Sequence, residues 1–359
     1  MLAALFLPVG QATAQTIPQL LLILEKSDNT MAFVDPATLQ VLARVPSGPD
    51  PHEIVASPDS KLAYISNYGG LGSFLNTISV VDLGARRVLP PIVLGALRSP
   101  HGLYFAGGEL YFTAETNKAI GRYDPGAQTV DWVMGTGQDR THMVLVSNSL
   151  DRIFTSNVIS GTISFIEQVE MPAPPGPPPG GGAAGNNFST GAAPPPGLGQ
   201  STGLPRKTWR VTNVSTGRGV EGFDVSPDGK ELWAANAQEG TVTIIDVASK
   251  SVLATVPLSI KGANRLKFTP DGKHVLVSGL GGDTSINLVI LDAASRKEIK
   301  TFDLGGGAAG ILMVPDGSRA FVAVSAKDKV VAVDLKTLEL AGSIATGKQP
   351  DGLAWVQGK

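Results

Sequence analysis

The segment PHEIVASPDSKLAYISN, residues 51–67, contains a pattern that returns along the chain. It begins with Pro-His, passes through a Ser-Pro-Asp turn and enters a short apolar run. Related segments are PHGLYFAGGELYFTAE from Pro100, THMVLVSNSLDRIFTSN from Thr141 and VEGFDVSPDGKELWAAN from Val220. Self-similarity at a fixed period indicates a repeat architecture, so this pattern decides the fold.

The repeat can be aligned on the residue six positions before the proline of each Ser-Pro-Asp-type turn. The spacings are then 49, 41, 79, 43, 45 and 42 residues, and removing a 38-residue insertion (169–206) from the long interval leaves 41. A unit of about 40–45 residues is the length of one four-stranded propeller blade. The aligned residues are His52, His101, His142, Glu221, Asn264, Ala309 and Asp351.

Each unit holds four runs that are typical of β-strands. In residues 221–258 these are EGFDVS, ELWAAN, TVTIIDVA and SVLATVPL, parted by turn-forming residues. The C-terminal QPDGLAWVQGK supplies a first strand with nothing after it, and the N-terminal region supplies strands two to four without a first. We therefore predict an all-β, seven-bladed propeller of four-stranded antiparallel blades over 15–359, closed by pairing N-terminal strands with the C-terminal one.

An aspartate closes the third strand in six units. Because Asp accepts hydrogen bonds from nearby backbone N–H groups, we expect these residues to cap turns at the outer rim rather than to serve a function. They are Asp35, Asp82, Asp124, Asp246, Asp292 and Asp334.

The insertion at 169–206 differs in composition from the rest of the chain. It holds 10 prolines and 9 glycines. Such a segment has too little apolar surface to form a core, so we predict a disordered appendage between strands three and four of blade 3. A tolerated insertion and a tether to a partner or cell wall are both open.

The N-terminal MLAALFLPVGQATAQ indicates export. Its short apolar run ends in Ala12-Thr13-Ala14, the small-x-small pattern of a signal-peptide cleavage site, although no Lys or Arg precedes the run. An apolar first strand is the alternative. We predict a signal peptide at 1–14 and a periplasmic or extracellular protein. The run is too short to span a bilayer, and no other segment approaches a membrane span.

Composition excludes several classes of function. The 29 basic and 31 acidic residues form no basic stripe, which argues against nucleic acid and anionic membrane surfaces as partners. The chain has no cysteine, so thiolate metal sites, iron–sulfur clusters and cysteine nucleophiles are excluded. The GGGAAG at 305–310 joins two strands rather than opening a helix, so we expect no nucleotide or flavin cofactor. We expect a monomer.

The second strands YISN (64–67), FTSN (154–157) and WAAN (233–236), followed by NTISVVDL and GTVTIIDV, resemble YVTN-type β-propeller repeats. The resemblance covers residues 18–357 apart from the insertion, and its relatives are exported bacterial propeller proteins. It implies the fold and not a function, because propellers host binding proteins, lyases, lactonases and redox enzymes. The second strands of blades 2 and 5 depart from the pattern, ending in Glu115 and Gly279.

The aligned residues identify a candidate site. In a propeller the first strand of each blade is innermost, so we expect all seven to form a ring at the mouth of the central channel. Three of the four histidines occupy these positions, in three adjacent blades. Imidazoles with a carboxylate suit Zn, Cu, Fe or Ni. The predicted metal ligands are His52, His101, His142 and Glu221, with Asn264 and Asp351 as further ring positions.

Two functions remain open for this ring. The first is an exported binding or interaction protein that takes an unknown small molecule or protein at its channel face, with or without a bound metal. The second is a metal-dependent enzyme, such as a lactonase-like hydrolase, a lyase or an oxidoreductase, for which Glu221 and Asp351 are the candidate acid–base residues. The histidines could instead be structural, bonding neighbouring blades. We favour the binding protein, because no catalytic constellation is visible beyond the ring.

Overall fold

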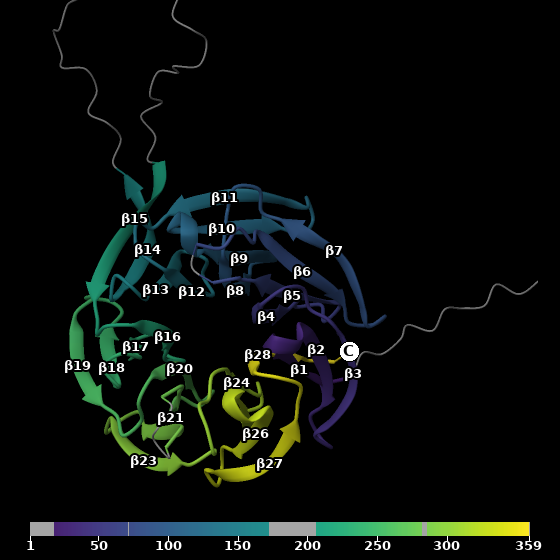
Figure 1. Cartoon of the computed structure of the whole chain (residues 1–359). Coiled ribbons are helices and arrows are strands. Elements are labelled where there is room, and N and C mark those ends of the chain that lie inside the picture. Colours follow the sequence, from purple (N-terminus) through teal and green to yellow (C-terminus); the bar gives the residue numbers. More distant parts are fainter. Residues whose placement is uncertain (1–17, 71, 172–205, 282–285, 359) are drawn as a thin grey trace, which may run out of the picture.

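The computed structural model describes residues 18–70, 72–171, 206–281 and 286–358. These residues form seven four-stranded antiparallel sheets, arranged as blades around a common axis (Figure 1). The predicted seven-bladed propeller is confirmed. In six blades the strands follow chain order, with the first strand innermost and the fourth at the rim, so the beginning of each first strand lies near the axis.

Blades are numbered from the first complete unit. Blade 1 consists of β4 (Pro51–Ala56), β5 (Leu62–Asn67), β6 (Thr77–Asp82) and β7 (Arg87–Val93), and blade 2 of β8 (Pro100–Ala106), β9 (Glu109–Ala114), β10 (Ala119–Asp124) and β11 (Thr129–Gly135). Blade 3 consists of β12 (Thr141–Val146), β13 (Arg152–Asn157), β14 (Thr162–Met171) and β15 (Arg206–Ser215). Blade 4 consists of β16 (Val220–Val225), β17 (Glu231–Asn236), β18 (Thr241–Asp246) and β19 (Val252–Pro257).

Blade 5 consists of β20 (Ala263–Phe268), β21 (His274–Gly279), β22 (Leu288–Asp292) and β23 (Lys297–Phe302). Blade 6 consists of β24 (Ile311–Met313), β25 (Arg319–Val324), β26 (Lys329–Asp334) and β27 (Glu339–Ala345). Blade 7 consists of β28 (Pro350–Val356), β1 (Leu20–Glu25), β2 (Thr30–Asp35) and β3 (Gln40–Pro46). Three short 3₁₀ helices lie in the described loops: η1 (Lys26–Asp28), η2 (Glu115–Asn117) and η3 (Ser325–Lys327).

Blade 7 joins the two ends of the chain, as the sequence predicts. β1 pairs antiparallel with β28, with Leu22 opposite Ala354. All six residues of β1 are buried, since neighbouring blades cover both of its faces. The pairing leaves no free inner edge where the ring begins and ends, which is how closed β-architectures avoid exposed edge strands.

The hydrophobic core lies between blades rather than within any one of them. Trp233 of β17 packs edge-on against Phe268 of β20 with ring centroids 5.5 Å apart, and the cluster around them draws on blades 4 and 5. Burying a large side chain stabilises a fold by about 1.5–3 kcal/mol. Repeating such clusters around the ring holds the blades, and therefore the starts of the innermost strands, in fixed relative positions.

The strand-closing aspartates cap turns, as predicted. The carboxylate of Asp35 accepts hydrogen bonds from the backbone N–H groups of Ala37 and Thr38, and Asp334 does the same for Lys336 and Thr337. Asp82, Asp124, Asp246 and Asp292 make equivalent contacts. These bonds lower the pKa of Asp35 and of Asp334.

Strands β14 and β15 extend into the predicted insertion. Each has ten residues, and their pairing runs to Met171 opposite Arg206. The first three residues and the last residue of 169–206 therefore belong to a regular hairpin. The remaining 172–205, and the predicted disorder there, lie outside the described residues, as does the predicted signal peptide at 1–14.

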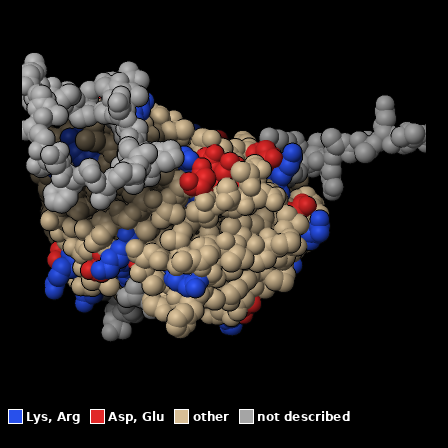
Figure 2. All heavy atoms as spheres, turned by 90° about the horizontal axis from the view of Figure 1, so that it is seen from above, with Lys and Arg blue, Asp and Glu red and all other residues tan. Residues whose placement is uncertain are grey.

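Charged side chains are scattered over the side of the ring shown in Figure 2, singly or in small groups, and most of the visible surface is neither acidic nor basic. Among the described residues, no helix has the length and apolar composition needed to cross a bilayer.

Candidate metal site at the channel mouth

The start of each innermost strand contributes to one cavity of about 270 Å³. All seven residues of the aligned series line it, which places them around one opening, as the repeat predicts. We call them the channel-mouth residues: Asp351, His52, His101, His142, Glu221, Asn264 and Ala309.

A left-handed backbone turn directs the chain toward this cavity. The residue two positions before each channel-mouth residue has a positive φ in six of the seven blades. Glycine, which adopts this conformation without strain, is present in blades 4 and 5. The other four blades keep a side chain there, which costs roughly 1–2 kcal/mol per residue. These residues are Asp50 (φ 45°), Ser99 (51°), Arg140 (57°) and Gln349 (54°), and the last two line the cavity.

Close approach of neighbouring innermost strands explains the Pro-His-Gly sequence. A Cβ on Gly102 would lie 2.5 Å from the carbonyl oxygen of His142, and one on Gly222 would lie 2.7 Å from that of Asn264. Both distances are shorter than van der Waals contact. Glycine after the channel-mouth residue therefore lets adjacent blades bring their side chains together.

In three blades a second repeat position also lines the cavity, and the repeat alignment did not identify it. This is the residue that follows the second strand of each blade. In blades 7, 5 and 6 it is Lys26, Leu280 and Ser325, which line the cavity, and in blades 1 and 2 it is Tyr68 and Glu115.

The register of blade 2 corrects the sequence alignment at Glu115. Pro51 pairs with Asn67 in blade 1, and the corresponding Pro100 pairs with Ala114. The first hairpin of blade 2 is two residues shorter, so Ala114 and not Glu115 occupies the position of the repeated asparagine. Glu115 begins η2 and is aimed at the neighbouring histidines.

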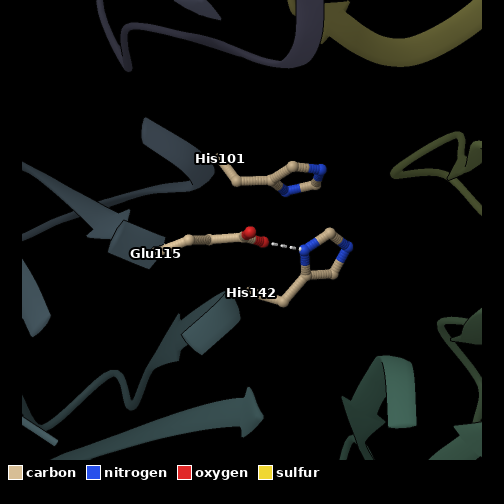
Figure 3. A group of neighbouring side chains, drawn as sticks. All are labelled: His101, Glu115 and His142. Atoms are coloured by element: carbon tan, nitrogen blue, oxygen red, sulfur yellow. Dashed lines mark hydrogen bonds and ion pairs between the residues drawn. The ribbon is translucent and has the colours of Figure 1, made fainter. Parts of the chain in front are cut away.

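His101, Glu115 and His142 form a buried group that could hold a metal ion. Their candidate ligand atoms lie within 4.8 Å of one another, and each residue is 1% exposed. Figure 3 shows the two imidazoles side by side, with the Glu115 carboxylate directed at His142. The ring centroids are 3.7 Å apart and Oε1 of Glu115 contacts Nδ1 of His142. Nδ1 of His101 is buried and has no hydrogen-bond partner among the described residues.

Tyr68 and Arg140 hold the other oxygen of Glu115. The Tyr68 hydroxyl donates a 2.6 Å hydrogen bond to Oε2, and Nε of Arg140 lies 3.5 Å from the same atom. The Tyr68 ring also packs edge-on against His101, with centroids 4.8 Å apart. Tyr68 therefore fixes the orientation of both neighbours, as outer-shell groups commonly do for metal ligands.

The two stacked histidines are electrostatically different. Burial, reinforced by the nearby His142 and His52, holds the pKa of His101 well below its usual range, so its imidazole is neutral. Burial also works to lower the pKa of His142, but the carboxylates of Glu221 and Glu115 outweigh it and raise that pKa. A neutral imidazole is the form that binds a metal, and His142 reaches this form by giving up its proton.

Glu221 contacts His142 from the cavity side. Its Oε2 lies 2.8 Å from Nε2 of His142, close enough for an ion pair but not aligned for a hydrogen bond. Its Oε1 lies 3.2 Å from Nη1 of Arg140. Burial would raise the pKa of Glu221, but His142, Arg140 and Arg265 lower it to about 2. Glu221 is therefore ionised at neutral pH.

The remaining channel-mouth residues lie outside the buried group. His52 has Nε2 3.3 Å from Asp50 and Nδ1 3.7 Å from Asp351, and its ring centroid is 5.1 Å from that of His101. Nζ of Lys26 lies 3.4 Å from the Asp351 carboxylate. Asn264 accepts a hydrogen bond from Arg265. Of the predicted metal ligands, His101 and His142 belong to the group, and Glu115 replaces His52 and Glu221 in it.

The fold has relatives among solved structures. A protein of unknown function from Desulfotomaculum acetoxidans is 12% identical with a TM-score of 0.68, and the match covers 94% of this chain and 98% of that one. A Kuenenia stuttgartiensis hydrazine synthase chain is 19% identical with a TM-score of 0.64, covering 85% and 89%. A Bacteroides fragilis protein provisionally named a 6-phosphogluconolactonase is 15% identical with a TM-score of 0.68, covering 94% and 98%.

These likenesses show a shared seven-bladed fold. No protein-family model matches the sequence, and no curated protein does. Identities of 12–19% carry no information about chemistry, so the function has to be argued from the site itself.

Proposed function

We propose that this protein is a metal-binding propeller that holds one transition-metal ion at His101, Glu115 and His142. The observation that carries the proposal is the buried, unpartnered Nδ1 of His101 beside a second imidazole and a carboxylate. A buried polar atom without a partner costs about 1–3 kcal/mol. Coordination would remove that cost and would satisfy the negative charge of Glu115.

The donor set fits Zn, Cu, Ni or Fe. Imidazole nitrogen and carboxylate oxygen bind such ions at about 2.0–2.2 Å, so ligands of one ion lie within roughly 4.4 Å of each other. The candidate ligand atoms are up to 4.8 Å apart. They therefore come within coordinating distance of one ion if the side chains move by less than about 1 Å and the two imidazole rings rotate out of their stack. Three protein ligands leave at least one coordination position open toward the cavity.

Metal content tests this assignment. We would purify the full chain without an affinity tag and measure bound metals by mass spectrometry, beside His101→Gln, Glu115→Gln and His142→Gln. About one equivalent in the parent and a loss in each variant, with circular dichroism unchanged, is the expected result. His274→Gln is the matched control, because His274 lies on β21 outside this group.

Two outcomes would contradict the assignment. No bound metal, even after incubation with Zn²⁺, Cu²⁺ and Ni²⁺, would make the histidines structural. A loss of metal in His52→Gln and Glu221→Gln, but not in Glu115→Gln, would restore the ligand set predicted from the repeat.

Binding is better supported than catalysis, although a metal-dependent hydrolase is the second candidate. The open coordination position and the adjoining cavity favour the enzyme. Glu221, however, has a pKa of about 2, and a general base works best with a pKa near the working pH. Asp351 is paired with Lys26 and lies outside the buried group. Turnover of simple lactones by the metal-loaded protein, lost in Glu221→Gln, would favour the enzyme.

The proposal includes export and a YVTN-type ancestry, which rest on the sequence. The repeated YISN, FTSN and WAAN segments support the ancestry, and MLAALFLPVGQATAQ supports the export. Cell fractionation and N-terminal sequencing of the mature chain test the export. A periplasmic or secreted protein beginning at Gln15 is expected, and an uncleaved cytoplasmic chain would contradict it. We also propose that the exported chain is monomeric.

A further inference from the structure

Cationic side chains from three blades line the same cavity as the histidines. Lys26 follows β1 of blade 7, Arg140 precedes β12 of blade 3 and Arg265 lies on β20 of blade 5. The carboxylates in the lining are those of Glu221 and Asp351. A divalent ion at the neighbouring group would add further positive charge. The loaded cavity would thus attract an anion.

Arg140 has hydrogen-bonding capacity left over. Its Nη1 donates to Glu221, but its Nε is buried and is not aligned with any acceptor among the described residues. The side chain is 26% exposed, so part of it remains open to the cavity. Its backbone has φ 57°, a strained conformation that blades 4 and 5 avoid with glycine. Blades 1, 2 and 7 share this conformation, which is a feature of the repeat and brings the Arg140 side chain to the cavity.

Arg265 and Lys26 provide fixed positive charge on other sides of the cavity. Arg265 is almost fully buried and donates to Glu53 at 2.7 Å and to Asn264 at 3.3 Å. Nζ of Lys26 lies 3.4 Å from Asp351, and its side chain is 25% exposed. The first is held rigidly, and the second is free enough to turn toward a ligand.

We propose that the cavity binds a small carboxylate, with one oxygen at the open metal position and the other accepting hydrogen bonds from Arg140. This inference rests on the proposed metal function. The cavity of about 270 Å³ suits a molecule of a few carbon atoms beside the ion rather than a nucleotide or a sugar polymer. The guanidinium has N–H groups beyond the Nη1 that donates to Glu221, and these can donate to the second oxygen.

A monoanion fits this lining better than a dianion. Glu221, Asp351, Glu53 and Glu115 together offset the three cationic side chains, so the positive surplus of the loaded cavity comes from the metal ion and is modest. Doubly charged phosphate would meet repulsion from these carboxylates, whereas acetate or hydrogencarbonate would meet less.

Isothermal titration calorimetry tests the carboxylate site. We would titrate the Zn²⁺-loaded and the metal-free full chain with acetate, hydrogencarbonate and, for comparison, inorganic phosphate, and repeat this with Arg140→Gln. The matched control is Arg218→Gln, because Arg218 is 77% exposed and pairs only with Glu239 among the described residues. Bound zinc is measured for every sample, so anion affinity is compared per bound metal.

The expected result is acetate binding to the loaded parent that weakens about tenfold or more in Arg140→Gln and is unchanged in Arg218→Gln. A loaded protein that binds no carboxylate, binds phosphate more tightly, or is unaffected by Arg140→Gln overturns the inference while the metal function stands. A chain that binds no zinc contradicts the metal function. In that case, carboxylate binding by the metal-free chain that Arg140→Gln abolishes would support the anion site, and its absence would overturn both.

Discussion

The pKa of a histidine at the channel mouth depends on the residues around it more than on its position in the repeat. His101 and His142 occupy equivalent positions in adjacent blades, yet burial keeps the pKa of the first low while Glu221 and Glu115 raise that of the second. The difference arises because His142 has carboxylates on two sides and His101 has none in contact. One repeat position thus provides two chemically distinct imidazoles.

Tyr68 should control metal affinity without touching the metal. Tyr68→Phe keeps the aromatic ring against His101 but removes the 2.6 Å hydrogen bond to Glu115. Loss of an outer-shell bond typically weakens metal binding by 10–100-fold, and a decrease in this range is expected. Competition with a chelator of known affinity measures it. Tyr64→Phe, a buried tyrosine of β5 away from the cavity, is the control, and equal affinities in both variants would contradict the role.

Glu221 should make the free energy of unfolding depend on pH under acidic conditions. Its pKa falls from an ordinary 4.5 to about 2 on folding, so its contribution is present above pH 4.5 and is lost as the pH falls toward 2. The shift corresponds to roughly 3 kcal/mol. In Glu221→Gln the free energy of unfolding should therefore fall less between pH 5 and pH 3 than in the parent.

Urea unfolding at pH 6, 5, 4 and 3 measures this difference. Glu239→Gln is the control, since Glu239 pairs with the exposed Arg218 and a surface ion pair contributes little. Parallel pH profiles for the parent and Glu221→Gln would show that the ion pairs of Glu221 do not stabilise the fold.

The sequence predicts the site residues that occupy the repeated channel-mouth position but not the site residues that lie outside it. The histidines stand out because they share one position with Glu221 and Asp351 across the blades. Glu115 could not be placed, because a hairpin shortened by two residues moves it out of alignment, and only the strand register reveals the shift. Arg140 could not be identified either, since its role depends on a side chain reaching across to Glu221.

The innermost strands are the elements that assemble the site, and their spacing depends on glycine. Gly102→Ala would place a methyl group 2.5 Å from the His142 carbonyl and 2.8 Å from the Met143 Cα. Because both atoms are backbone, blade 3 must shift, at a cost of about 1–3 kcal/mol. Lower stability and weaker metal binding are expected together.

Thermal unfolding and metal titration test this change. Gly135→Ala is the matched control, since an added Cβ there has open space on β11 and the residue has no left-handed conformation to lose. If Gly102→Ala behaves as Gly135→Ala does, adjacent innermost strands tolerate more separation than the close contact indicates.

The sequence predicts the strands and turns well because their signals are local. The alternation of β-branched residues, the Ser-Pro-Asp-type turns and the aspartates after third strands each act within a few residues. The additional length of β14 and β15 was not predicted, because Val169–Met171 pair with residues 206–208 across a long gap in the sequence. Local patterns do not report such a pairing.

The ring as a whole should tolerate removal of the Pro/Gly-rich segment. β14 and β15 pair continuously out to Met171 and Arg206, beyond the rim of the other blades, so a two-residue Asn-Gly turn can replace 172–205 there. The shortened chain should keep its unfolding midpoint within a few degrees and retain its metal content. Differential scanning calorimetry and metal analysis test this. A large loss of stability would show that 172–205 packs on the ring.

Closure of the ring sets the order in which the site can be completed. His101, Glu115 and His142 come from the early blades, but Asp351 is on β28, which must pair with β1 from the other end of the chain. A growing polypeptide therefore cannot finish the cavity wall until β28 has left the ribosome. A chain halted before Pro350 would leave the inner edge of β1 unpaired, so metal loading belongs after synthesis, and incomplete products should be open to proteolysis.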